Sequence, residues 1–153
     1  MRTIGIIGHG IVGSAIASGF VRLGHDIRVH DVKFNTIIEN VLDTDVCFVC
    51  VPTPSREDNS CDTTIVRSVI DDLNGLEYKG VVVIKSTVEP GTTQALIDKY
   101  ENLNICFVPE FLRERCAAAD FVDNHDLCVI GTHSQENYEL IKSVHGHFPE
   151  EFV

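Results

Sequence analysis

The feature that most constrains this chain is the alternation of short apolar runs with segments of helical periodicity. Val and Ile dominate most of the apolar runs, which is typical of parallel strands covered on both faces. We expect strands at Thr3–Ile7, Ile27–Asp31, Val46–Val51, Val81–Lys85, Asn104–Val108 and Leu127–Gly131. We expect helices at Ile11–Leu23, Phe34–Leu42, Thr63–Leu73, Thr92–Tyr100 and Gln135–His145. This repetition predicts an α/β fold with a doubly wound, mainly parallel sheet of about six strands.

Length and charge indicate how many domains the chain forms and which partners it can bind. The 153 residues suit one domain, so we treat 1–153 as a single unit. Twelve basic against 23 acidic residues give a net charge of −11. Such a surface repels phosphate backbones and anionic lipids, so neither nucleic acid nor membrane is an expected partner. No run approaches the ~18 apolar residues of a membrane span, and the first residues lack a secretory pattern, so a cytoplasmic location is expected.

The six cysteines are expected to be free thiols. Cys47 and Cys50 have CxxC spacing but lie within an expected strand, where residues i and i+3 point to opposite faces. They therefore cannot share a metal ion, and core packing is the favoured interpretation. The seven histidines show no metal-ligand spacing either, and His145 is expected at an exposed helix end. No metal site is predicted.

A glycine motif follows the first expected strand and opens the first expected helix. It reads Gly8-His9-Gly10-Ile11-Val12-Gly13, which is GxGxxG. In this setting the first glycine permits a tight turn, the second lets the backbone approach a pyrophosphate, and the third lets helix and strand pack closely. The motif predicts a Rossmann-type dinucleotide site. We expect no separate role for the His9 ring.

Asp31 ends the second expected strand, 18 residues after Gly13. A carboxylate there accepts hydrogen bonds from the adenosine ribose and repels a 2′-phosphate. NAD is therefore the expected cofactor rather than NADP, although Lys33 nearby acts in the opposite direction.

Three further segments leave the ends of expected strands. They are Val51-Pro52-Thr53-Pro54, the KSTVEPGTT run from Lys85 to Thr93, and the VPEFLRE run from Val108 to Glu114. Open α/β sheets bind ligands at the carboxyl ends of their strands, so these hydroxyls and carboxylates should converge beside the cofactor. The alternative for each segment alone is ordinary turn chemistry.

Together these residues resemble the amino-terminal, NAD-binding domain of the UDP-glucose/GDP-mannose dehydrogenase family. The resemblance runs from residue 2 to about residue 148, and VPTP, KSTVEPGTT, PEFLRE and CVIG are its most specific parts. Family members oxidise the C6 alcohol of a nucleotide sugar to a carboxylate. They use two NAD molecules and pass through a thiohemiacetal and a thioester on a cysteine.

The resemblance implies roles for individual residues. Asp31 and the loop from Gly8 to Gly13 correspond to NAD contacts, and Val51, Thr53, Ser86 and Thr87 correspond to the nicotinamide side. Glu110 resembles the acid/base carboxylate, and Thr87 with Glu114 resembles the pair that positions water. Phe111, Leu112 and Arg113, together with Glu110, correspond to a segment that contacts substrate.

The chain departs from the family in four places. The nucleophilic Gly-Gly-x-Cys segment, the central helix and the substrate domain have no counterpart in these residues, so we expect no complete reaction from this chain alone. Only 14 residues separate Asp31 from Val46, where the family has about 30 more, so the sheet is expected to be shortened after its second strand. Arg115 replaces a usual Gly, and Leu127 replaces a usual Arg.

Several functions remain open at this level. One is the cofactor half of a nucleotide-sugar dehydrogenase, completed by a second protein chain and acting on a UDP- or GDP-sugar. Another is a stand-alone NAD or nucleotide-sugar binding module with a regulatory use, and a third is a relic with little affinity. A 3-hydroxyacid dehydrogenase is disfavoured by VPTP, KST and PEFLRE.

The placement of Glu110 and Glu114 relative to Thr87 distinguishes a working half-site from a relic. If the chain is helical after the fifth strand, Glu110 and Glu114 share one face that looks across at Thr87. The alternative is that they pair with Arg113 or Arg115, or cap the next helix.

Overall fold

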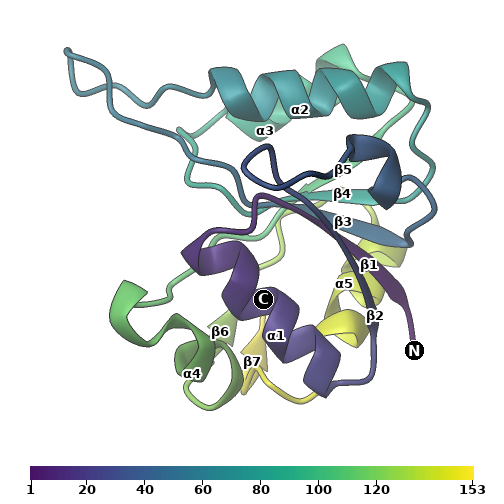
Figure 1. Ribbon diagram of the computed structural model, residues 1–153, viewed down its shortest axis with the longest axis vertical. Coiled ribbons are helices and arrows are strands. Elements are labelled where there is room, and N and C mark those ends of the chain that lie inside the picture. Colours follow the sequence, from purple (N-terminus) through teal and green to yellow (C-terminus); the bar gives the residue numbers. More distant parts are fainter.

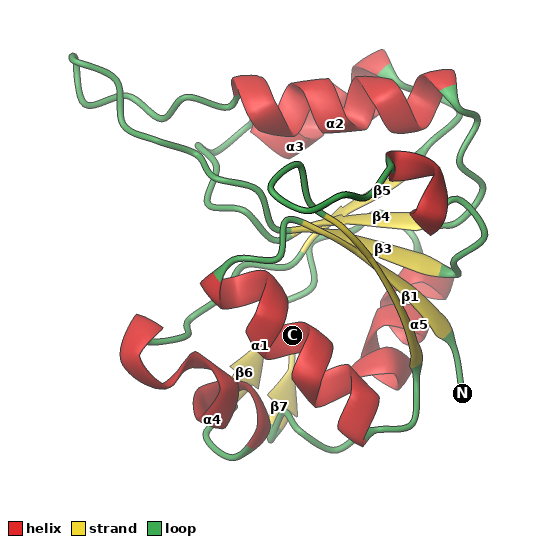
Figure 2. Cartoon of the chain, in the orientation of Figure 1, coloured by secondary structure: helices red, strands yellow, loops and turns green.

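A five-stranded parallel sheet lies between two layers of helices in the computed structural model, which describes residues 1–153 (Figures 1 and 2). The strands are β1 (Thr3–Ile7), β2 (Asp26–His30), β3 (Val46–Val49), β4 (Val81–Ile84) and β5 (Asn104–Phe107), in the order β2-β1-β3-β4-β5. The helices are α1 (Ile11–Arg22), α2 (Thr64–Gly75), α3 (Thr92–Lys99), α4 (Ala117–Val122) and α5 (Gln135–His145), with 3-10 helices η1 (Ile38–Val41) and η2 (Glu114–Cys116). The predicted fold class is confirmed.

Strands β1, β3, β4 and β5 contribute side chains to two separate cores, one on each face of the sheet. On one face Ile4 and Ile6 pack in the core that contains the buried side chains of α1, α4 and α5. On the other face Ile7 packs with the apolar sides of α2, α3 and η1. Because side chains alternate along a strand, Cys47 and Cys50 enter opposite cores, as the spacing predicts.

The edge strand β2 differs from the four others. Strands β3 and β4 are buried at every position, whereas β2 exposes Asp26 and Arg28 to solvent. The Arg28 guanidinium lies 3.0 Å from the Asp26 carboxylate, and charges of this kind discourage pairing with another strand. The shortened segment after β2 therefore leaves this strand as the outer edge of the sheet.

The expected sixth strand does not join this sheet. Only Leu127–Cys128 is extended as β6, and it pairs with β7 (Glu151–Phe152) in a separate two-stranded sheet. Gly131 instead forms an isolated antiparallel bridge with Phe107, so the chain runs against β5 there. The main sheet thus has five strands rather than six.

Two helix predictions also need correction. The expected helix over Phe34–Leu42 is reduced to η1, because Thr36 Oγ1 bonds the backbone N–H and C=O of Asp31 and holds the preceding residues in turns. Helix α4 follows the PEFLRE segment and was not expected; its six residues are too few to show a helical period.

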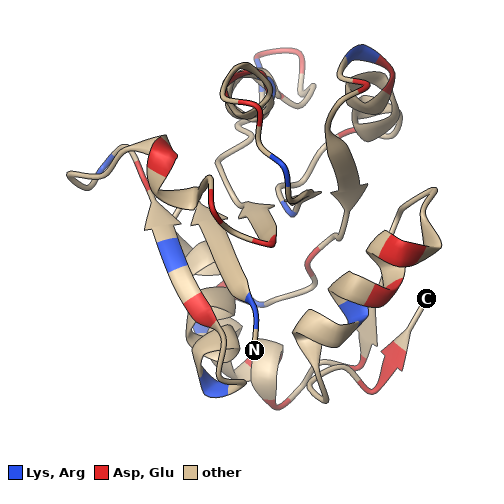
Figure 3. Cartoon of the chain, turned by 90° about the vertical axis from the view of Figure 1, so that its right-hand side faces the viewer, with Lys and Arg blue, Asp and Glu red and all other residues tan.

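The prediction for His145 also needs correction, because this residue is fully buried rather than exposed at the end of α5. Acidic residues occur on many elements of the chain, on helices, strands and loops (Figure 3). None of the helices is both long enough and apolar enough to cross a membrane.

Candidate cofactor and substrate site

The turn between β1 and α1 requires glycine at two of its three motif positions. Gly8 has a φ of +93°, and a Cβ there would meet the Cys50 carbonyl oxygen at 2.6 Å. A Cβ on Gly13 would lie 1.8 Å from the Gly8 carbonyl oxygen. The first and third glycines therefore allow backbone to pack against backbone, as the motif predicts.

Gly10 is different, because a Cβ there would meet no atom within 4 Å. The protein does not need a glycine at this point for its own packing, but a group approaching the turn from outside would. Gly10 precedes the first turn of α1, which has no side-chain cap and no acidic residue. The amides of Ile11, Val12 and Gly13 have no acceptor within the protein. Free amides at a helix start suit a phosphate, so this turn fits the pyrophosphate of a dinucleotide.

Asp31 lies beside the glycine turn at the end of β2. Its Oδ1 accepts a hydrogen bond from the Lys33 amide at 2.8 Å, and its Oδ2 accepts one from the His9 amide at 2.7 Å. These two backbone hydrogen bonds lower the pKa of Asp31, so the side chain is ionised at neutral pH. Each carboxylate oxygen retains a second lone pair that can accept from a ribose hydroxyl. The geometry suits a ribose without a 2′-phosphate.

The segments that follow β3 and β4 are joined to each other. Ser86 Oγ donates to the Val51 carbonyl oxygen at 2.7 Å, which ties the start of KST to the start of VPTP. Cys61, from the projecting loop between β3 and α2 (Figure 1), lies with Sγ 3.4 Å from the Thr87 carbonyl oxygen and 4.0 Å from that of Thr53. The expected nicotinamide-side residues are therefore brought together, and Thr87 is exposed among them.

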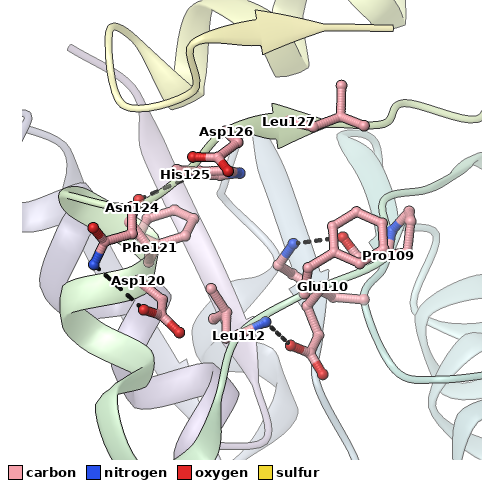
Figure 4. Close-up of a pocket in the computed structure, with 11 residues that line it drawn as sticks. Pro109, Glu110, Leu112, Asp120, Phe121, Asn124, His125, Asp126 and Leu127 are labelled. Atoms are coloured by element: carbon pink, nitrogen blue, oxygen red, sulfur yellow. Dashed lines mark hydrogen bonds between the residues drawn. The ribbon is translucent and has the colours of Figure 1, made fainter.

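Glu110 lines a cavity of about 330 Å³ beyond the carboxyl end of β5 (Figure 4). The side chain is half-buried, and its Oε2 accepts from the Leu112 amide at 2.7 Å. The other lining residues include Lys85, Phe111, Leu112, His125, Asp126 and Leu127. Leu127 thus faces the same cavity as the candidate acid/base carboxylate.

Lys85 is a site residue that the sequence analysis did not single out. It is only 3% exposed, and its Nζ donates to the carbonyl oxygens of Pro109 and Val108 at 3.3 and 3.5 Å. Burial lowers the pKa of Lys85, and the nearby Glu110 carboxylate opposes that change. The ammonium therefore holds the backbone immediately before Glu110. The sequence signal for this role is that Lys85 directly follows an apolar strand, where a charged side chain needs polar partners.

The two glutamates do not share a helical face. Residues 110–113 are not helical, and Glu114 begins η2. Glu114 is exposed and lines a different hollow, together with Ile11 and Ser14 at the start of α1. No hydrogen bond joins Thr87 to either glutamate.

Arg113 pairs with Asp120 rather than with a glutamate. Its Nη2 lies 2.7 Å from Asp120 Oδ1, and its backbone and Nε both donate to Asp120 Oδ2 at 2.9 Å. This closed set of bonds fastens PEFLRE to α4. Phe111, by contrast, is 65% exposed, and Leu112, which lies between Phe111 and Arg113 in the sequence, is half-buried.

The parallel sheet and the glycine turn, with the Asp31 carboxylate beside it, define an NAD-binding Rossmann domain of the dehydrogenase type. Comparison with known proteins specifies the family. Residues 28–149 match the UDP-glucose/GDP-mannose dehydrogenase family, NAD binding domain. The chain belongs to this family as its NAD-binding domain, and NAD is its cofactor.

Individual relatives agree with this assignment. UDP-glucose 6-dehydrogenase AglM of Haloferax volcanii is 30% identical over 187 residues, covering 92% of this chain and 43% of the relative. UDP-glucose 6-dehydrogenase of Rickettsia typhi is 34% identical over 128 residues, covering 80% of this chain and 29% of the relative. The chain thus spans less than half the length of these curated relatives. The alignment with the Haloferax volcanii protein is longer than this chain, so that protein has inserted residues within the aligned region.

Solved structures show the same fold. A UDP-glucose dehydrogenase from Pyrobaculum islandicum superimposes with a TM-score of 0.88 at 27% identity, over 100% of this chain and 46% of that one. A 3-hydroxyisobutyrate dehydrogenase of Mycobacterium tuberculosis reaches 0.78 at 17% identity, over 100% of this chain and 54% of that one. The second likeness extends to the fold alone.

Proposed function

We propose that residues 1–153 form the cofactor half of an oxidoreductase that converts a primary alcohol of a UDP- or GDP-sugar to a carboxylate. The observation that carries the proposal is the half-buried Glu110 carboxylate, which lines a cavity at the same sheet edge as the glycine turn. More than half of each curated relative lies outside the matched region, so the partner would be a second domain or a second chain.

The proposed division of work follows from the groups present. Oxidation of a primary alcohol to a carboxylate releases two hydrides, so one NAD molecule would accept a hydride in each of two successive steps. Glu110 would remove the alcohol proton, because a carboxylate in a partly dry cavity can act as a general base. Lys85 would hold the Pro109 carbonyl and so fix the backbone that carries Glu110. Thr87 and Glu114 would position water only after a rearrangement, since Glu114 lines a different hollow from the one that contains Glu110.

A stand-alone binding module is the second candidate. It is favoured by the hydrogen bond that the Leu112 amide donates to Glu110 Oε2, because this bond occupies one of the two carboxylate oxygens that could accept the alcohol proton. In that case the chain binds NAD or a nucleotide sugar without transforming it.

The cofactor assignment is tested by calorimetry with NAD and NADP. We expect NAD to bind and NADP to bind at least about tenfold more weakly, because Asp31 repels a 2′-phosphate. Gly10→Val should abolish NAD binding without loss of fold, since its side chain would enter the open space above the turn.

Gly75→Ala is the matched control, because a Cβ there also meets no atom within 4 Å but lies at the end of α2. It should bind NAD normally. Equal affinity for NAD and NADP would contradict the Asp31 assignment, and unchanged binding by Gly10→Val would contradict the pyrophosphate site.

A further inference from the structure

Phe34 is an exposed aromatic residue beside the carboxylate assigned to the ribose. It is 53% exposed and follows Asp31 by three residues. Of the eight phenylalanines only Phe34 and Phe111 are exposed, and the others lie fully or partly in the cores. Val32 and Ile37 in the same loop are also exposed, at 88% and 60%. Single exposed apolar residues are common, but three within six residues call for an explanation.

The backbone of Phe34 is held on both sides. Its N–H donates to the Asp31 carbonyl oxygen at 3.0 Å, and its own carbonyl oxygen accepts from the Thr36 amide at 2.9 Å. Thr36 Oγ1 in turn bonds the backbone N–H and C=O of Asp31 at 3.0 and 3.1 Å. The loop is therefore tied to the residue that would bind the ribose.

The ring of Phe34 also contacts the glycine turn. Its centroid lies 6.0 Å from that of the His9 imidazole, with the two planes at 64°. His9 is fixed through its amide, which donates to Asp31 Oδ2. One side of the Phe34 ring is thus supported by the glycine turn, while about half of the side chain remains open to solvent.

We propose that Phe34 is the adenine-binding residue of this domain and stacks against the base of NAD. The inference rests on NAD binding at the glycine turn and adds the residue that recognises the base. Adenine is joined directly to the ribose placed at Asp31, so the base must lie near this loop. Stacking on an aromatic ring stabilises a bound base, and it would cover apolar surface that is otherwise exposed. Because β2 is the sheet edge, no further strand offers an alternative wall on that side.

A tryptophan at this position reports stacking directly. The chain has no tryptophan, so Phe34→Trp introduces a single indole at the proposed site. We expect NAD and AMP to quench its fluorescence, because both carry adenine. Nicotinamide mononucleotide, which carries a phosphate but no adenine, should not change the emission.

Affinity supplies the second measurement. Phe34→Ala should weaken NAD and AMP binding about tenfold, the lower part of the range for one stacked base, while Phe34→Leu should recover only part of the loss. Val21→Ala is the matched control, because Val21 is 57% exposed on the last turn of α1 and should leave affinity unchanged. Thermal melts establish that each variant is folded.

The outcomes separate this inference from the assignment on which it rests. Failure of the wild-type chain to bind NAD would overturn both. NAD binding that Phe34→Ala leaves intact, or an indole that is silent at saturating NAD, would overturn the role of Phe34 alone.

Discussion

His145 has its imidazole in the core among aromatic rings, with centroids 5.4 Å from Phe20 and 5.9 Å from both Phe48 and Phe121. Its Nδ1 donates to the Ile141 carbonyl oxygen at 2.8 Å, which assigns the neutral tautomer, and its Nε2 is buried without a partner. Burial is the main cause that lowers the pKa of His145 to about 3, and the positive charge of Lys85 adds to it. The residue is therefore a buried neutral group.

This burial predicts acid-sensitive stability. Between pH 3 and about 6.5, His145 is protonated in the unfolded chain but neutral in the folded chain. The contribution of His145 to the free energy of unfolding is therefore complete above about pH 6.5 and decreases as the pH falls. At pH 5 the loss should be about 2 kcal/mol. Urea unfolding of the wild type and of His145→Met at pH 7.5 and 5 measures it. A difference between the two proteins that does not change with pH would contradict the prediction.

At the scale of elements, the segment between β5 and α4 depends on the Arg113–Asp120 pair. Asp120 is buried and accepts from the backbone and the guanidinium of Arg113, which together hold its pKa far below the ordinary carboxyl range. The contribution of this pair to stability is therefore complete above about pH 4, the ordinary carboxyl value, and decreases as the pH falls further toward the lowered pKa of Asp120. It fixes the path of Phe111 and Leu112 past the cavity.

Asp120→Asn should loosen this segment, because it removes the charge and one acceptor from a site with several donors. We expect a lower Tm and faster hydrogen exchange at the amides of Leu112 and Arg113, with NAD affinity unchanged. Asp43→Asn is the control, since Asp43 is 69% exposed and lies 3.5 Å from Arg28. Unaltered exchange in Asp120→Asn would show that the segment is held by other contacts.

At the scale of the whole molecule, four of the six thiols belong to the two cores and are disposed for packing rather than for covalent chemistry. Cys47, Cys106 and Cys128 are buried, and burial raises the pKa of Cys128 to about 11 and that of Cys50 to about 12. None of the cysteines lines the cavity that contains Glu110. Since the thiolate is the nucleophile, these groups are poorly suited to form a thioester.

The 153-residue chain should therefore bind NAD without oxidising a nucleotide sugar. The rate of NADH formation, measured by absorbance with NAD and either UDP-glucose or GDP-mannose, should not exceed the rate measured without the sugar. Cys61→Ser is the informative companion, because Cys61 Sγ lies 3.4 Å from the Thr87 carbonyl oxygen. Steady NADH production that this variant loses would contradict the prediction and assign Cys61 as the nucleophile.

Local patterns in the sequence were enough for the fold class and the cofactor turn. Alternating strands and helices, the spacing of Gly8, Gly10 and Gly13, and Asp31 at a strand end are short-range features whose geometry allows few alternatives. The opposite orientation of Cys47 and Cys50 follows in the same way from the two-residue period of a strand.

Long-range contacts decided the rest. Leu127–Cys128 pairs with a strand that is 24 residues away, and the Lys85 ammonium finds its acceptors beyond β5, so neither is visible in a local pattern. His145 is buried because residues from α1, β3 and α4 surround it. Glu110 and Glu114 are separated because residues 110–113 are not helical, and the Arg113–Asp120 pair fastens this stretch to α4. Sequence thus determined the fold class and most of the elements, whereas the packing of distant elements determined which side chains meet.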